Sequence, residues 1–127
     1  MNILFKRESS KNFESIVKDF KKEVDKSNFG ILWQLDLSEK IQSKGIYFSD
    51  KYLIFEVCNP KMAKKVLDIN LDSGVFLPCK IVLYKKGDKT IVGMAKPTDL
   101  IKLVEPSANS IAKKIKEELI QVIENIV

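Results

Sequence analysis

The two cysteines, Cys58 and Cys79, are the residues whose type and position most clearly suggest chemistry. Both occur within the stretch 52–80, which reads as a strand, a capped helix, a turn and the start of another strand. Asn59 is a favourable N-cap and Pro60 a favourable first helical residue, so Cys58 is expected beside a helix N-terminus. The positive end of the helix dipole favours a thiolate there, which predicts a lowered pKa for Cys58.

Cys79 enters a later strand and would approach Cys58 if the two strands are neighbours. Lys61, in the first turn of the helix, would add positive charge near Cys58. Such a pair of thiols could form a reversible disulfide, carry a sulfur species, or bind a soft ligand with Met62 or Met94. The alternative is that both cysteines are buried and act as small hydrophobic residues. The candidate ligand or thiol site comprises Glu56, Cys58, Asn59, Pro60, Lys61 and Cys79.

Several common chemistries lack their residues in this chain. It contains no histidine, the usual general base and the commonest metal ligand. Its five glycines form no phosphate-binding loop, and its cysteines form no CxxC pair for a zinc site. Asp36 and Glu56 lie in expected strands and could act as a carboxylate pair, but solvated carboxylates are far commoner. These absences favour a protein without a metal or cofactor, and a binding role over an enzymatic one.

The composition predicts one globular domain spanning residues 1–127. Hydrophobic residues make up 45% and charged residues 31% of the 127 residues, as in ordinary globular proteins. The first apolar run is short, and no segment approaches the roughly 20 apolar residues of a membrane helix, so we expect a cytoplasmic protein without membrane contact. The net charge of +5 is mild and favours a solvated lysine-rich surface over nucleic-acid binding. The lysines that could form a nucleic-acid patch are Lys61, Lys64, Lys65, Lys85, Lys86 and Lys89.

Hydrophobic periodicity predicts a domain of strands and helices, in which the strands 79–84 and 90–95 pair antiparallel and the last helix packs along the sheet. The strand 52–57 is apolar on both sides, which predicts a central strand whose second face is partly covered. In the strand 31–36, Ile31, Trp33 and Leu35 are expected to share one face. The other expected strands are 3–5, 79–84 and 90–95, and the expected helices are 13–24, 61–67 and 107–126.

The stretch YLIFEVCNPKMAKKVLDINLDSGVFLPCKIVLYKKGD resembles the signature region of the family known as domain of unknown function 302. The similarity rests on the Cys-Asn-Pro step, the short helix with Ala63, the aspartate-glycine loop and the Leu-Pro-Cys segment. It covers residues 1 to about 95, before the expected helix of about 107–126. The resemblance implies a single small α+β domain of the TATA-binding-protein or helix-grip type, with an antiparallel sheet of about four to six strands and helices packed on one face. It also implies a frequent homodimer and no established activity.

These observations favour one function and leave two alternatives open. The first is a module that binds a small ligand or a partner, forms a homodimer, and has a groove near Cys58 and Cys79. The second is a thiol-dependent redox or sulfur-handling protein, which would require a reactive Cys58. The third is a weak nucleic-acid binder, which is supported only by the basic charge and the implied fold.

Overall fold

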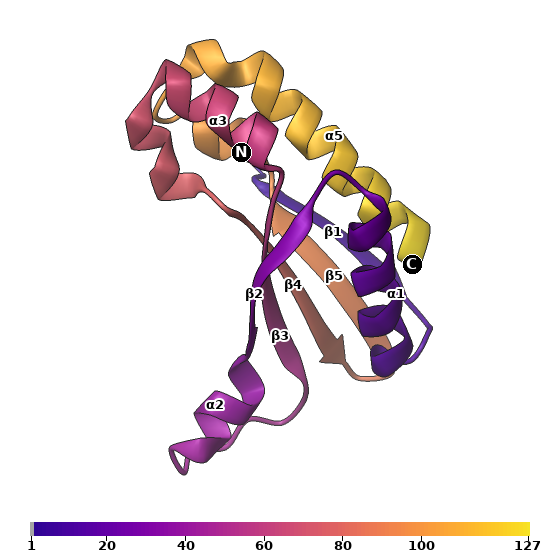
Figure 1. Cartoon of the computed structure of the whole chain (residues 1–127). Helices are drawn as coiled ribbons and strands as arrows, with labels where there is room; N and C mark the ends of the chain where they lie inside the picture. Colours follow the sequence, from indigo (N-terminus) through magenta and orange to yellow (C-terminus); the bar gives the residue numbers. More distant parts are fainter. Residues whose placement is uncertain (1) are drawn as a thin grey trace.

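The protein is a five-stranded antiparallel sheet with its main helices on one side (Figure 1), described for residues 2–127 by a computed structural model. The strands, in the order β1-β5-β4-β3-β2 across the sheet, are β1 Leu4–Ser9, β2 Gly30–Asp36, β3 Tyr52–Cys58, β4 Cys79–Lys86 and β5 Lys89–Ala95. The helices are α1 Phe13–Lys26, α2 Leu37–Ser43, α3 Pro60–Ile69, α4 Pro97–Ile101 and α5 Asn109–Ile126, with 3₁₀ helices η1 Leu71–Phe76 and η2 Pro106–Ala108. This arrangement confirms the predicted α+β class.

The core lies between the sheet and the layer formed by α1, α3 and α5 (Figure 1). Side chains alternate along β3, so Leu53, Phe55 and Val57 are buried toward the helices. Phe55 packs against Phe20 of α1, with ring centroids 4.9 Å apart. Apolar residues recur at helical spacing along α5, and Leu119 among them is fully buried. Two amphipathic helices and one face of the sheet therefore exclude water from a single core.

A β-bulge in β2 separates residues that the sequence pattern placed together. Ile31 is opposite the core residue Val57, whereas Trp33 is opposite Glu56 on the other face, and the pairing register shifts between Ile31 and Trp33. The prediction that Ile31, Trp33 and Leu35 share one face is therefore wrong for Ile31. An extra residue in one strand reverses the alternation beyond it, and period-two counting does not detect such an insertion.

The face of the sheet opposite the helices is called the open face here. Its side chains alternate with the core residues along each strand: Lys6, Glu8, Trp33, Leu35, Tyr52, Ile54, Glu56, Lys80, Val82, Tyr84 and Ile91. The rings of Tyr52 and Tyr84 stack with centroids 5.1 Å apart and planes 5° from parallel. The second apolar face predicted for the strand 52–57 thus belongs to a broad mixed surface.

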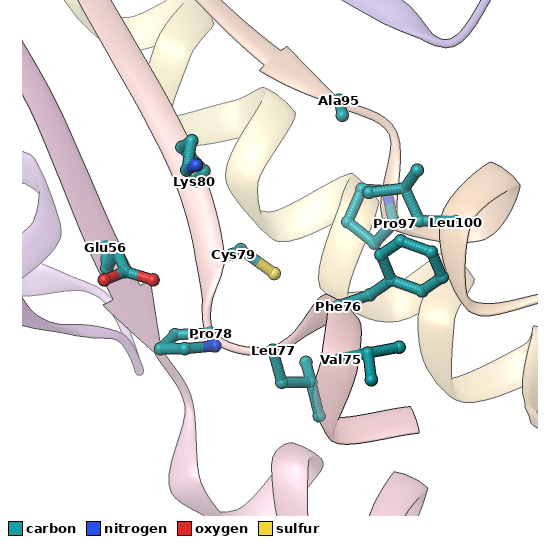
Figure 2. A pocket seen from close by; sticks show the side chains of 10 residues that line it. All are labelled: Glu56, Val75, Phe76, Leu77, Pro78, Cys79, Lys80, Ala95, Pro97 and Leu100. Carbon is teal, nitrogen blue, oxygen red and sulfur yellow. The ribbon is translucent and has the colours of Figure 1, made fainter. Parts of the chain in front are cut away.

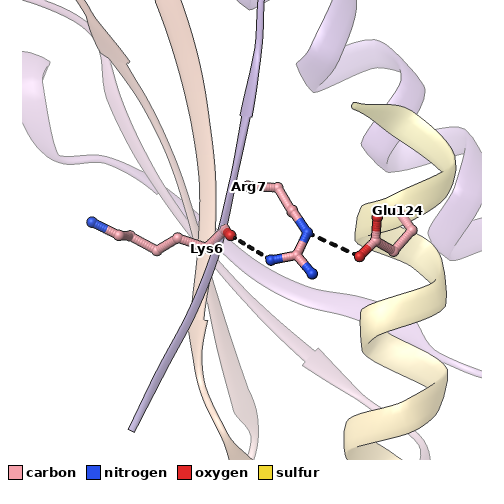
Figure 3. A network of polar contacts seen from close by, with 3 residues as sticks. All are labelled: Lys6, Arg7 and Glu124. Atoms are coloured by element: carbon pink, nitrogen blue, oxygen red, sulfur yellow. Dashed lines mark hydrogen bonds and ion pairs between the residues drawn. The ribbon is translucent and has the colours of Figure 1, made fainter. Parts of the chain in front are cut away.

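Arg7 and Lys6 leave β1 on opposite sides of the sheet (Figure 3). Arg7 Nε donates to Glu124 Oε1 of α5 at 2.9 Å, and its guanidinium lies 4.2 Å from the centroid of the Phe5 ring. Both members of the ion pair are about two-fifths exposed, so the pair contributes at most about 1 kcal/mol. The pair links α5 to β1 on the helical side of the sheet, and strand alternation places Lys6 on the open face.

Local capping and turn residues set the ends of several elements. Asn12 caps α1, because its Oδ1 accepts from the Ser15 backbone N–H at 2.8 Å. The segment 68–74 contains the end of α3 and most of η1. A hairpin joins β4 to β5, with Gly87 at φ 62° in its turn, a conformation that favours glycine.

Candidate functional site

A pocket of about 270 Å³ lies at the end of the sheet where β3 and β5 finish and β4 begins (Figure 2). Antiparallel pairing brings Glu56 of β3 opposite Lys80 of β4, and both residues line the pocket. The Cys79 sulfur points toward the apolar group formed by Phe76, Pro97 and Leu100 (Figure 2). The remaining lining residues are Val75, Leu77, Pro78 and Ala95. The pocket therefore combines an apolar wall with one acidic and one basic side chain.

Local sequence signals explain how the walls of this pocket are placed. The Asn70 side chain accepts from the Asp72 backbone N–H at 2.9 Å and starts η1, which ends in the pocket residue Phe76. Pro97 opens α4 at a position where a missing N–H costs nothing, and that helix carries Leu100 to the pocket. The backbone N–H of Lys96, just after the end of β5, donates to the Ile3 carbonyl at 2.7 Å. This hydrogen bond holds the end of β5 beside the start of β1.

The two charged residues of the pocket are free to contact a ligand. No ion-pair partner lies within 4.0 Å of the Glu56 carboxylate or the Lys80 ammonium among residues 2–127. Lys80 is exposed and Glu56 half-buried. Residues directly opposite in an antiparallel pair have Cβ atoms about 5 Å apart. A molecule with adjacent positive and negative groups would therefore reach both side chains.

The structure brings the two cysteines together, because the strands that carry them are neighbours. Cys58 ends β3 and Cys79 begins the neighbouring β4, and both are free thiols. They line a void of about 10 Å³, together with Phe29 and Ile115 among others. This void has about the minimum volume for one water molecule and no room for an organic ligand. Of the two thiols, only Cys79 also lines the larger pocket.

The chemical state of the thiols differs from the sequence prediction. Burial raises the pKa of Cys58, although the thiol adjoins the N-terminus of α3. Burial and, secondarily, the neighbouring Cys58 raise the pKa of Cys79 to about 12. Desolvation disfavours the charged thiolate and here outweighs the helix dipole. The prediction of a lowered Cys58 pKa is wrong, and both thiols are protonated at neutral pH.

Asn59, Pro60 and Lys61 lie outside the main pocket, around a separate hollow at the start of α3. Asn59 acts as the N-cap of α3, since its Oδ1 accepts from the Met62 backbone N–H at 3.3 Å. Pro60 occupies the first helical turn, as predicted. The six candidate residues therefore do not form one site. Glu56 and Cys79 line the pocket, Cys58 adjoins Cys79, and the other three lie at the start of α3.

Two alternative sites are not assembled by the fold. Asp36 is the N-cap of α2, accepting from the Glu39 backbone N–H at 2.9 Å, and is opposite Leu53 rather than near Glu56. Burial acts to raise the Asp36 pKa, but hydrogen bonds from Ser38 and Glu39 lower it overall. The lysines of the expected basic patch are also separated. Those of α3 lie near the start of β4, whereas Lys85, Lys86 and Lys89 lie near the end of β4. At about 3.3 Å per strand residue, the two ends of β4 are about 20 Å apart.

Neither a metal cluster nor a membrane-crossing helix was found in the described part of the chain. Within residues 2–127, no group of three or more carboxylate, thiol or imidazole side chains is placed to hold a metal ion. Over the same residues, every helix is too short or too polar to cross a bilayer.

Sequence reasoning missed the pocket residues contributed by β5, η1 and α4. Ala95, Phe76 and Leu100 come from segments without any reactive side chain, so a search for chemistry passes over them. The signal that could have found them is topological. The hairpin after β4 returns the chain as β5, so the segment beginning at Pro97 must start beside Cys79.

Comparison with known proteins places this architecture in a family. The sequence profile of the family described as domain of unknown function DUF302 matches residues 5–126. The chain belongs to this family. The match includes α5, so the DUF302 region extends beyond the residues 1–95 that carried the resemblance in the sequence.

A solved relative shares the whole DUF302 fold. It is the crystal structure of an uncharacterised conserved DUF302 protein from Bacillus stearothermophilus, 35% identical, with a TM-score of 0.94 and 98% of each chain covered. No curated protein matches the chain. The family and the α+β fold are therefore shown, while the relative's description assigns it no activity.

Proposed function

We propose that this DUF302 protein binds a small zwitterionic molecule with an apolar body in the pocket at the end of the sheet. The observation that carries the proposal is the pairing of unpartnered Glu56 and Lys80 beside an apolar wall. The carboxylate would accept hydrogen bonds from an ammonium group of the ligand, and the Lys80 ammonium would donate to its carboxylate. Phe76 and Leu100 would cover the apolar body. An α-amino acid with a branched aliphatic side chain has this chemistry.

The pocket volume supports a ligand of this size. A cavity of about 270 Å³ lies just below the usual range for small-molecule sites. L-leucine is small and carries an ammonium group, a carboxylate and a branched aliphatic side chain, so it is a suitable probe.

Binding without conversion is the role that the nearby groups support. The pKa of the Cys79 thiol is raised to about 12, so this group is neither a nucleophile nor a base at neutral pH. The sequence contains no histidine that could activate it. We therefore propose a carrier, sensor or interaction role for the protein and no covalent step on Cys79.

Filling the pocket tests this proposal. Leu100→Trp should weaken L-leucine binding at least tenfold, measured by isothermal titration calorimetry or ligand-detected NMR, because the indole would occupy the cavity. Leu103→Trp is the matched control, since Leu103 is 67% exposed and does not line the pocket; it should change the affinity less than twofold. Isovalerate, which lacks the ammonium group, should bind more weakly than L-leucine. Equal affinities for the two tryptophan variants would contradict the proposal.

A homodimer is the second property that we propose, and the edge strand β2 supports it. The bulge leaves Leu32 and Trp33 exposed, at 61% and 46%, on a strand whose outer edge pairs with no other strand among residues 2–127. Edge strands readily pair with another chain, and tryptophan is the residue type most enriched among interface hot spots. A second copy of the chain would cover both side chains.

The single tryptophan gives this proposal a direct measurement. Sedimentation velocity should show a dimer, and the Trp33 emission should shift to shorter wavelength as protein concentration rises through the dissociation constant. Trp33→Lys should give a monomer with an unchanged circular dichroism spectrum, because the side chain is not in the core. A wild-type protein that stays monomeric at millimolar concentration would refute the dimer.

A further inference from the structure

We infer that a hollow above Gly93 on the open face is a second ligand site, which accepts a flat aromatic anion. The hollow has a volume of about 310 Å³ and is separate from the end pocket, although Lys80 and Ala95 adjoin both. Its ligand differs in chemistry from the zwitterion proposed above, so the two proposals can fail independently.

Gly93 lines the hollow and places no side chain in it. Gly93 on β5 lies between Lys6 of β1 and Val82 of β4 in the pairing register. A Cβ atom added to it would come within 3.3 Å of Lys6 Cγ and 3.5 Å of Val82 Cγ2. The stems of these neighbours therefore border the space directly, and a larger side chain at this position would fill it.

The walls of the hollow are suited to a flat aromatic ring. Tyr84 lines it and stacks on Tyr52, which lines it too, and Phe48 meets the Tyr52 ring edge-on with centroids 6.3 Å apart. The stacked tyrosines hold each other in place, so they form a preorganised aromatic wall. Val82 provides an apolar floor beside Gly93. An aromatic ring placed there would gain offset or edge contacts with tyrosine and replace water over apolar surface.

The charge around the hollow is positive. Lys6 and Lys80 both line it and are exposed, and neither has an ion-pair partner within 4.0 Å among residues 2–127. Figure 3 shows Lys6 extending away from the helical side of the sheet, opposite to Arg7. The two open-face carboxylates, Glu8 and Glu56, do not line the hollow. Glu8 lies opposite Ile91 of β5, and Glu56 lies opposite Lys80 of β4. Two lysines at one apolar hollow favour an anionic head group on the ring.

NMR titration with 1-naphthoate tests the site, with 1-naphthalenemethanol as its neutral analogue. In the wild type, 1-naphthoate should shift the amide signals of Gly93, Val82 and Tyr84 and bind about fivefold more tightly than the alcohol, since exposed charges add modest energies. Gly93→Val should weaken 1-naphthoate binding at least tenfold. Gly30→Val is the matched control, because a Cβ at Gly30 has no atom within 4 Å, and it should leave the affinity within twofold.

Two further variants keep the test decisive if Gly93→Val does not fold. Lys6→Ala should reduce the preference for 1-naphthoate over the alcohol to twofold or less, while the unfolding midpoint stays constant because Lys6 is exposed. Leu100→Trp, which fills the other pocket, should leave 1-naphthoate binding intact. Equal binding of acid and alcohol to the wild type would overturn the proposal. Absence of 1-naphthoate binding, with Gly93→Val converting a dimer to a monomer, would instead assign the hollow to contact with a second copy.

Discussion

Phe55→Ala is expected to lower the free energy of unfolding by about 4 kcal/mol, within the range for truncating buried phenylalanines. Phe55 has 0% exposure on an interior strand, and its ring packs against Phe20. The substitution removes apolar surface from the core and leaves a cavity that the surrounding strands and helices fill only in part. Since domains of this size are stable by about 5–15 kcal/mol, the variant should lose a large part of its stability.

Urea denaturation followed by circular dichroism measures this loss. Tyr47→Ala is the control, because Tyr47 is 86% exposed, and its free energy of unfolding should change by less than about 0.5 kcal/mol. A Phe55→Ala variant that unfolds at nearly the wild-type urea concentration would contradict the packing described here. A fall in the slope of unfolding with urea would indicate that the core had loosened already in the folded state.

The second large effect is a loss of stability in alkali caused by Cys79. Its pKa is about 12 in the folded protein and 9.0 as an unperturbed thiol. Below pH 9 both states hold the proton, so the contribution of this group to stability is fully present. Between pH 9 and 12 the unfolded chain loses the proton first, and stability should fall by about 1.4 kcal/mol per pH unit from this thiol alone.

Comparing the wild type with Cys79→Ala isolates the contribution of Cys79 to the loss of stability in alkali. Lysines and tyrosines also titrate in alkali, and burial raises the pKa of Tyr52 in the same direction. These groups are common to both proteins, so the difference between the two stability curves reports Cys79. Curves that remain parallel from pH 8 to 11 would show that Cys79 has an ordinary pKa.

Thiol labelling provides a second measurement of the same property. Raising the Cys79 pKa from 9.0 to about 12 lowers its thiolate fraction about a thousandfold at neutral pH. Labelling of native Cys58→Ala protein with a thiol-specific disulfide reagent should therefore follow the rate of unfolding. Rapid labelling of Cys79 without unfolding would show that the thiol is reactive in the folded protein, and it would support the thiol-dependent redox function instead.

The sequence alone determined those features of this protein that depend on near neighbours in the chain. The α1 and α5 periodicities, the Asn59-Pro60 start of α3 and the turn at Gly87 were predictable because caps, turns and amphipathic faces are set within a few residues. The single α+β domain follows from these elements. The pairing of the two cysteine-bearing strands was not among these features, because near neighbours in the chain do not decide which strands lie side by side.

Only the tertiary structure decided which residues form a site and in what chemical state. The bulge in β2 moved Ile31 to the helical face, and the pocket drew Phe76 and Leu100 from segments that carry no reactive group. The local dipole argument favoured a thiolate at Cys58, but burial raises its pKa. Solvent exposure depends on contacts between distant segments, and the cost of desolvating a charge can exceed the local effects that a sequence displays.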